Sequence, residues 1–519
     1  MRLSACLAAC FALAVATATL HAQTPAAEAG AAHAYQAAVQ AGPPALRAFL
    51  DQFPKGADLH IHLSGAVYAE TFIRDAGEDK LCIDPAGLKF AWDNQGDPVK
   101  EPCTPPFVRA AQLPANQEFY DRLINAFSMR GFVPTPGFSG HDQFFATFGR
   151  FGGLNKRHIG EWVDEVAGRA AAQNQQYVEL METPPFSHAA AIAHENSLNP
   201  DFAQYRQTLL ALGLRDEIFI DREDARAAEA LRREIEHCGT TQAASACRVE
   251  VRYIYQVLRG YAPEQVFAQT LLGFETIQQS MAAHEPSWVG INFVMPEDGF
   301  ISMRDYTLQM KMLDYLHSVY PRVHISLHAG ELAAGQVPPE SLRIHIRQAV
   351  ELGHAERIGH GVDLAYEDDA SGLLKEMAAK HVMVEINLSS NDGILGVKGA
   401  NHPFPLYRAA HVPVALSTDD EGVSRIDITR EYVRAALDYH LSYLDLKQLA
   451  RTGMEHSFLP GVSLWAAPDV FTMPAAACKA QPLGADKPSA ACKAFLDGSE
   501  KAAAQWELER RFRAFEAKF

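Results

Sequence analysis

The sequence predicts an α/β protein built as a (β/α)8 TIM barrel, and two observations support this. Short apolar, β-rich runs alternate with long amphipathic runs, which is typical of parallel strands joined by helices. Polar residues with metal-binding or acid–base chemistry follow several of the apolar runs, and a barrel collects its functional groups from the carboxyl ends of its strands. A doubly wound open sheet shows the same alternation, but the polar strand ends favour the barrel. The predicted strands lie within residues 54–66 and at 177–182, 249–255, 288–294, 323–327, 357–359, 382–386 and 412–417.

The chain of 519 residues divides into four predicted segments. Residues 1–22 have a basic start, an uncharged run rich in Ala, Leu and Val, and a small residue at the end, which predicts a secretory signal peptide. Residues 23–53 are an Ala-rich lead-in with one short helix. Residues 54–470 form the barrel, with an insertion after its first strand, at about 77–115, that is rich in Pro, Gly, Asp and Asn. Residues 471–519 form a C-terminal helical extension.

Composition narrows the classes of partner. A hydrophobic content of 48% supports a large core, and a formal net charge of -17 argues against a nucleic-acid-binding surface. No stretch after the signal is long and apolar enough to span a membrane, so we expect a periplasmic or secreted protein without a membrane partner. A transmembrane anchor is one alternative, which the short, Ala-rich apolar run disfavours. A lipoprotein is another, disfavoured because the cleavage-like box L-A-A-C at residues 7–10 lies too near the N-terminus. A homodimer is compatible with the sequence.

Cysteine spacing predicts three local disulfides. Six cysteines follow the signal peptide, in three close pairs within polar or Pro/Gly-rich segments, as expected for an exported protein: Cys82 with Cys103, Cys238 with Cys247, and Cys478 with Cys492. Six buried free thiols are the alternative. No C-x-x-C pair occurs, so a thiolate zinc site is not expected.

The first predicted strand carries His60 and His62, separated by one residue in the run H-I-H-L-S-G-A. Side chains at positions i and i+2 of a strand point to the same face, as two ligands of one metal must. The alternative is two unrelated histidines, one in the core and one in a turn. Further ligand-type residues at other strand ends favour the metal site.

Three later motifs supply those residues. They are His328 and Glu331 in H-A-G-E after the fifth predicted strand, His360 in R-I-G-H-G at the sixth, and Asp419 and Asp420 in S-T-D-D after the eighth. Each motif alone has a structural explanation: a surface glutamate, a glycine turn with a core histidine, or a helix N-cap. Their occurrence together at strand ends indicates one site at the mouth of a barrel.

These residue types suit hydrolytic chemistry. Three neutral imidazoles and one carboxylate can hold zinc and leave a position for water, and zinc lowers the pKa of that water toward neutrality. Glu331, three residues after His328, can exchange a proton with a substrate beside the metal. His360 can orient or deprotonate the water.

Taken together, the four motifs resemble those of the adenosine deaminase family of metal-dependent hydrolases, over about residues 54–425. The signal and the cysteine-paired insertion are similar to those of its secreted, growth-factor-related branch. The resemblance implies one Zn²⁺ per chain and hydrolysis of a purine nucleoside, adenosine or 2′-deoxyadenosine, to the inosine product and ammonia. The roles it implies are metal binding by His60, His62, His328 and Asp419, protonation of purine N1 by Glu331, assistance to the attacking hydroxide by His360, and contact with N7 by Asp420.

Two departures bear on the substrate-binding residues, which we expect to include Ser64, Gly65, Met295 and Asp420. Ser64 stands where the family often has an acidic residue that contacts ribose, and Met295 replaces a glycine that lets backbone approach the purine. A related hydrolase acting on adenine, AMP or another amino-purine keeps the same metal site and is the alternative function. A catalytically silent secreted binding protein is disfavoured because every ligand and Glu331 are present. A cytidine-type deaminase would need H-x-E with P-C-x-x-C.

Overall fold

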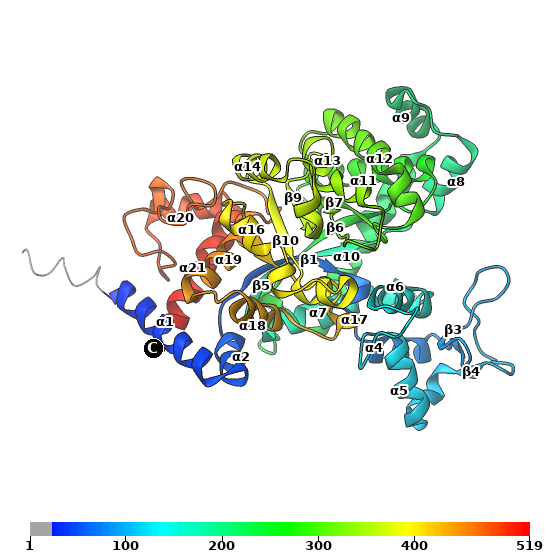
Figure 1. The fold of residues 1–519 in the computed structure, drawn as a ribbon, viewed down its shortest axis with the longest axis horizontal. Helices are drawn as coiled ribbons and strands as arrows, with labels where there is room; N and C mark the ends of the chain where they lie inside the picture. The colour runs from blue at the N-terminus through cyan, green and yellow to red at the C-terminus, as the bar shows by residue number, and fades with distance from the viewer. Residues whose placement is uncertain (1–22, 155, 286) are drawn as a thin grey trace, which may run out of the picture.

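The computed structural model describes residues 23–519 apart from residues 155 and 286 (Figure 1). The predicted signal peptide at 1–22 lies outside the described residues. Within the described part of the chain, no helix combines the length and apolar character needed to cross a membrane.

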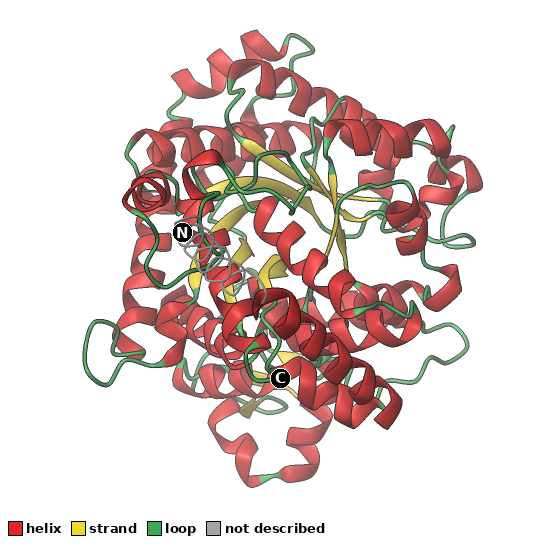
Figure 2. Ribbon diagram, turned by 90° about the vertical axis from the view of Figure 1, so that its left-hand side faces the viewer, coloured by secondary structure: helices red, strands yellow, loops and turns green. Residues whose placement is uncertain are grey.

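A parallel barrel forms the centre of the molecule, with helices around it (Figure 2). In the described residues its sheet has eight strands, and all the predicted strands are confirmed: β1 Gly56–His62, β5 Gln175–Glu182, β6 Glu250–Leu258, β7 Trp288–Val294, β8 His324–Ala329, β9 Arg357–His360, β10 Met383–Ile386 and β11 Val414–Leu416. The ring closes where β1 meets the residues after β11. There the His62 N–H donates to the Asp419 carbonyl (3.1 Å) and the Asp419 N–H to the His60 carbonyl (2.9 Å).

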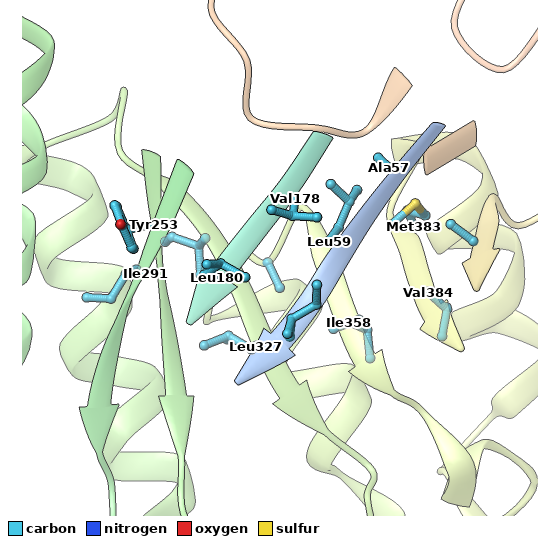
Figure 3. Packing of buried hydrophobic residues seen from close by; sticks show 14 of the residues in the cluster. Ala57, Leu59, Val178, Leu180, Tyr253, Ile291, Leu327, Ile358, Met383 and Val384 are labelled. Carbon is cyan, nitrogen blue, oxygen red and sulfur yellow. The ribbon is translucent and has the colours of Figure 1, made fainter. Parts of the chain in front are cut away.

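Alternation along the strands separates the hydrophobic core from the barrel interior. Ala57 and Leu59 of β1 lie beside Val178 and Leu180 of β5 in the main hydrophobic cluster (Figure 3). Because successive side chains point to opposite faces of a strand, the intervening residues of β1 point into the barrel. His60 is one of them, and it contacts Glu385 on β10 across the interior.

A buried ion pair network fills the barrel below the histidines. The Arg357 guanidinium lies 2.6 Å from Glu179 and 2.7 Å from Glu385, and all three side chains are fully buried. The same guanidinium lies over the Phe458 ring, 3.8 Å from its centroid. Breaking such a buried pair by removing one partner typically costs about 3–5 kcal/mol of stability. This network therefore holds in place the part of the barrel interior that supports the site.

Helices surround the barrel on all sides (Figure 2). The long ones are α7 Ile159–Ala172, α10 Ile218–Ile235, α11 Pro263–Ala282, α12 Phe300–Val319, α14 Ala370–Lys380, α18 Ile428–Asp438 and α19 Tyr443–Glu455. Shorter helices are α3 Leu63–Ala66, α8 Ser187–Glu195, α9 Phe202–Ala211, α13 His345–Glu351, α15 Leu388–Leu395, α16 Phe404–Ala409 and α17 Glu421–Ser424.

The segment between β1 and β5 builds a separate layer beside the barrel (Figure 1). It comprises α4 Ala69–Glu78, the antiparallel strands β2 Cys82–Asp84, β3 Lys89–Phe90 and β4 Val108–Arg109, α5 Gln117–Ala126 and α6 Gly140–Phe151. It has its own hydrophobic cluster, to which Phe72, Phe90 and Phe144 belong. The disulfide Cys82–Cys103 joins β2 to the loop before β4. The other two predicted pairs are also joined, Cys238 to Cys247 and Cys478 to Cys492.

The two ends of the described chain pack together on the far side of the barrel from this layer (Figure 1). The expectation of one short helix in the lead-in is wrong: α1 Gln23–Ala41 precedes α2 Pro43–Asp51, because an Ala-rich run has high helix propensity. The C-terminal extension contains α20 Ala490–Asp497 and α21 Glu500–Glu516. Phe49 of α2 contacts Phe515 and Phe519, with ring centroids 5.2 and 5.4 Å apart.

Candidate active site

The four predicted metal ligands converge at the carboxyl end of the barrel. His60 and His62 end β1, His328 lies near the end of β8, and Asp419 follows β11. The Nε2 atoms of His62 and His328 are 3.1 Å apart. Asp419 Oδ1 lies 3.4 Å from His60 Nε2 and 3.3 Å from His62 Nε2. The side chains therefore face one common point.

Each of the three histidines makes a hydrogen bond through Nδ1, the ring nitrogen that faces away from the common point. The partner oxygens are Glu385 Oε2 for His60 (2.6 Å), Gln256 Oε1 for His62 (2.5 Å) and Asn292 Oδ1 for His328 (2.8 Å). Because these oxygens only accept hydrogen bonds, each Nδ1 carries a proton. In a neutral ring this leaves a lone pair on each Nε2 directed at the common point, the arrangement found in ligating histidines.

The donor set fits a divalent cation. The close Nε2 lone pairs of His62 and His328 repel one another unless a positive charge lies between them. His60 Nε2 and Asp419 Oδ1 are buried and have no hydrogen-bond partner among the described residues. Burial lowers the pKa of His60, but the nearby carboxylates of Asp419 and Glu385 outweigh it and raise that pKa to about 10, so the local potential favours positive charge at this point. Three nitrogens and one oxygen suit zinc.

Glu331 lies beside this point with its carboxyl group buried. Its side chain is 9% exposed. Burial raises the pKa of Glu331 well above its ordinary value, and the negative charges of Asp419 and Glu297 raise it further. A carboxyl group that keeps its proton at neutral pH can act as a general acid.

His360 lies within the same cluster, since ligand-type atoms of His60, His328, His360 and Asp419 all lie within 4.8 Å of one another. Its Nε2 is 3.9 Å from Asp419 Oδ2 and its Nδ1 is 3.7 Å from Glu331 Oε1. The Asn391 amide donates to Nδ1 (2.9 Å), so the ring proton sits on Nε2, toward Asp419. Burial lowers the pKa of His360 to about 3, and the ring is therefore neutral and able to orient a small polar molecule.

Three residues at this mouth hold positive φ angles, which side chains rarely adopt. They are Met295 (φ +88°), His360 (φ +69°) and Asp419 (φ +61°). Such conformations cost about 1–3 kcal/mol each and persist only where the surrounding structure enforces them. The Met295 thioether lies close to Gly260, since a Cβ built on Gly260 would be 2.8 Å from Met295 Cε.

A cavity of about 320 Å³ opens above these groups, a size suited to a small molecule. Three of the residues expected to bind substrate, Ser64, Met295 and Asp420, line it together with His62, His328, Glu331 and Asp419. Gly65 is not among the described lining residues of this cavity, and an added Cβ would lie 1.4 Å from Asp420 Oδ1. Gly65 therefore provides the space that the Asp420 side chain occupies.

Sequence reasoning missed two groups of site residues. One is the aromatic wall of the cavity, Phe144, Phe145 and Phe148 on α6; their F-F-x-x-F spacing indicates a helix face without indicating its partner. The other is the set of Nδ1 partners, Gln256, Asn292 and Glu385. Each of these is a polar residue at an interior position of an otherwise apolar strand, and this pattern is the sequence signal that could have indicated them.

The adenosine deaminase family model matches residues 157–463. The chain belongs to the adenosine deaminase family. Adenosine deaminase from Escherichia coli (strain SMS-3-5) is 42% identical over 137 residues, which cover 26% of this chain and 38% of that protein. Adenosine deaminase from Clostridium perfringens (strain 13) is 34% identical over 135 residues, covering 26% of this chain and 37% of the relative. The matched stretch thus spans little more than a third of these relatives.

Solved structures share the fold over 78–80% of this chain. Adenine deaminase from Arthrobacter aurescens aligns with a TM-score of 0.50 at 17% identity, over 78% of this chain and 94% of that one. Arabidopsis ADAL in complex with IMP aligns with a TM-score of 0.50 at 20% identity, over 79% and 93%. A Burkholderia ambifaria amidohydrolase with bound Zn aligns with a TM-score of 0.51 at 18% identity, over 80% and 88%. At these identities the likeness concerns the barrel alone.

Proposed function

We propose that this protein is a zinc-dependent hydrolase that converts adenosine and 2′-deoxyadenosine to the inosine products and ammonia. One observation carries the proposal: four candidate metal-ligand atoms converge at the base of a small cavity beside the buried carboxyl group of Glu331, whose pKa burial raises. A hydrolytic deamination needs these two components next to each other, an activated water and a proton donor for the ring.

The chain's own residues divide the remaining work. When bound, the metal would make water nucleophilic at neutral pH. Attack at the amino-bearing carbon of the purine breaks ring conjugation, and the adjacent ring nitrogen gains electron density. Glu331 supplies a proton to that nitrogen as the charge develops, which lowers the barrier. His360, through its Nε2 proton, orients the water, and Asp420 provides a hydrogen-bonding group for the base.

A neutral nucleoside suits this cavity better than a nucleotide. Among its described lining residues there is no Lys or Arg, whereas Glu331, Asp419 and Asp420 all contribute carboxyl groups. Phosphate recognition normally uses guanidinium or ammonium groups or helix N-termini. Phe144, Phe145 and Phe148 instead offer an apolar wall against which a base can pack.

The test is a kinetic comparison of the purified mature protein on adenosine, 2′-deoxyadenosine, adenine and AMP, followed by ultraviolet absorbance. We expect kcat/KM for the two nucleosides to exceed that for AMP and adenine. A higher kcat/KM for AMP would overturn the choice of substrate. Glu331→Gln should lower kcat by about 10²–10⁴-fold while the zinc content stays at the parental level.

The matched control is Glu340→Gln, at an exposed glutamate in the segment after β8, which should leave kcat unchanged. A Glu331→Gln protein that folds normally, holds zinc and turns over at the parental rate would show that another residue is the proton donor.

We also propose an exported location. The three disulfides support it, because such bonds persist in oxidising compartments. Cell fractionation with peptide mapping under non-reducing conditions tests this proposal. Recovery of the protein in the cytoplasm with free thiols would refute it.

A further inference from the structure

Glu297, which follows β7, holds the backbone of the loop that carries Glu331. The Gly330 N–H donates to Glu297 Oε1 (3.0 Å), and the Glu331 N–H donates to Glu297 Oε2 (2.9 Å). The Glu297 residue is only 2% exposed. One buried carboxylate thus accepts from two successive amides, the second of which belongs to the candidate proton donor.

His345, at the start of α13, supports this carboxylate from the other side. Its Nδ1 donates to Glu297 Oε1 (2.5 Å). The imidazole stacks on Tyr306 with ring centroids 3.8 Å apart, and the Tyr306 hydroxyl donates to the His345 carbonyl (2.8 Å). Burial opposes ionisation of Glu297, but His345 and the charge of Arg259 outweigh it and lower the pKa of Glu297 to about 2. The acceptor is therefore a charged one, which makes its hydrogen bonds strong.

The loop has little room to move away from Glu297. Gly330 has φ +75°, and a Cβ added there would lie 2.4 Å from Asp363 Oδ1 and 2.8 Å from Ile346 Cγ1. The Val362 N–H also donates to the Gly330 carbonyl (2.7 Å). The loop is thus held at its Gly330 carbonyl by Val362 and at its Gly330 and Glu331 N–H groups by Glu297.

We propose that Glu297, supported by His345, is a positioning residue that sets the place and direction of the Glu331 carboxyl group in the cavity. The inference rests on the proposed proton-donor role of Glu331. Glu297 lines no part of the cavity among the described residues, so it acts through the loop. Its removal should impair proton delivery more than substrate binding.

Glu297→Gln is the main variant, because it keeps the shape and replaces one acceptor oxygen by an NH₂ group. That group would meet a donor, so at least one N–H of the loop or of His345 loses its acceptor. A misplacement of about 1 Å near the reacting atoms can cost about 10²-fold in rate. We therefore expect kcat to fall by about 10–100-fold, with KM and zinc content close to the parental values.

Glu367→Gln is the matched control. Glu367 is also buried and also accepts from two successive amides, Ile346 (2.6 Å) and Arg347 (3.2 Å). These amides open α13, and among the described residues no hydrogen bond or ion pair joins Glu367 to the loop 328–331. A general loss of stability should appear in both variants, whereas the fall in kcat should appear in Glu297→Gln alone.

A second measurement does not depend on activity. Amide hydrogen exchange at Gly330 and Glu331 should be roughly tenfold faster in Glu297→Gln than in Glu367→Gln, since a lost hydrogen bond is worth about that factor. Faster exchange with an unchanged kcat would overturn the positioning role, and so would unchanged exchange. If the parent deaminates no purine, the proposed function fails, while the exchange result still decides whether Glu297 holds the loop.

If Glu297→Gln does not fold, His345→Phe replaces it, because phenylalanine retains the stack on Tyr306 and removes the hydrogen bond to Glu297. We then expect a smaller fall in kcat and faster exchange at the same two amides. Parental kcat and exchange in His345→Phe would overturn the proposal.

Discussion

Glu385→Gln tests whether a residue outside the ligand set controls metal affinity. Glu385 Oε2 lies 2.6 Å from His60 Nδ1, and its other oxygen lies 2.7 Å from Arg357 Nε and 3.0 Å from Ser326 Oγ. Glutamine removes the negative charge and can present an NH₂ group to Nδ1. The ring would then favour the tautomer with its proton on Nε2, where the metal must bind.

The structure bounds the size of the effect. Loss of a hydrogen-bonding partner behind a metal ligand typically costs about 10–100-fold in metal affinity, which corresponds to about 1.4–2.7 kcal/mol. Arg357 keeps its second partner, Glu179, at 2.6 Å, so the buried guanidinium is not left uncompensated. Glu385→Ala would add a cavity and a larger charge imbalance, which is why glutamine is the better replacement.

Glu179→Gln is the control. It weakens the same Arg357 pair at the same depth, but Glu179 bonds to Tyr177 and to the Phe458 N–H rather than to a ligand. Competition with a metal-binding dye measures affinity, and urea unfolding measures stability. We expect both variants to lose stability and only Glu385→Gln to lose zinc affinity. Equal zinc affinity in the two variants would refute the reasoning.

Three further predictions concern the mouth of the barrel. Gly65→Ala should lower kcat/KM by about 10²-fold with normal zinc content, because the new Cβ takes the place of Asp420 Oδ1. The control is Gly168→Ala, where an added Cβ meets no atom within 4 Å, and equal kinetics for the two variants would contradict the prediction. The hydrogen bond of His141 on α6 with Asp298 (3.1 Å) raises the pKa of His141 against the effect of burial. This pair adds less than about 1 kcal/mol of stability because it is partly exposed, and that stability is present below pH about 6.5 and lost as pH rises through the folded-state pKa of His141. The difference in unfolding free energy between the parent and His141→Gln should therefore shrink as pH rises, and a difference that stays constant with pH would contradict the prediction. Removing zinc with a chelator should lower the unfolding free energy by about 2.7 kcal/mol relative to protein at a zinc concentration 100 times Kd; no dependence on zinc concentration would argue against a native metal site.

The fold could be predicted because its signal is local and repeated. Each strand is a short apolar run, and the polar residues that end β1, β8 and β11 stand in compact motifs such as H-x-H and S-T-D-D. Parallel strands bring their carboxyl ends to one edge, so residues 360 positions apart, such as His60 and Asp420, could be assigned to one site from the chain alone.

The groups behind the ligands could not be predicted, because their role depends on distances across the barrel. Asn292 and Gln256 are single polar residues within apolar strands, and no spacing rule relates either one to a histidine. The same holds for α6, whose phenylalanines line the cavity because the layer between β1 and β5 places this helix at the mouth of the barrel. The sequence pattern shows that such a helix has an apolar face, but the tertiary structure decides what that face covers.

The two glutamates singled out above do similar work at different depths. Glu385 connects the proposed ligand His60 to the ion pair with Arg357, and Glu297 connects the proposed proton donor Glu331 to α13. Both are buried, both accept several donors, and neither lines the cavity among the described residues. Exchange of either for glutamine should therefore separate two functions that a ligand mutation disrupts together: Glu385→Gln should weaken metal binding while Glu331 stays in place, and Glu297→Gln should misplace Glu331 while the metal stays bound. Zinc content and kcat measured in both variants would show this crossed pattern. If both variants lost zinc and activity in parallel, the barrel mouth would have to behave as one cooperative unit in which these contacts have no separate roles.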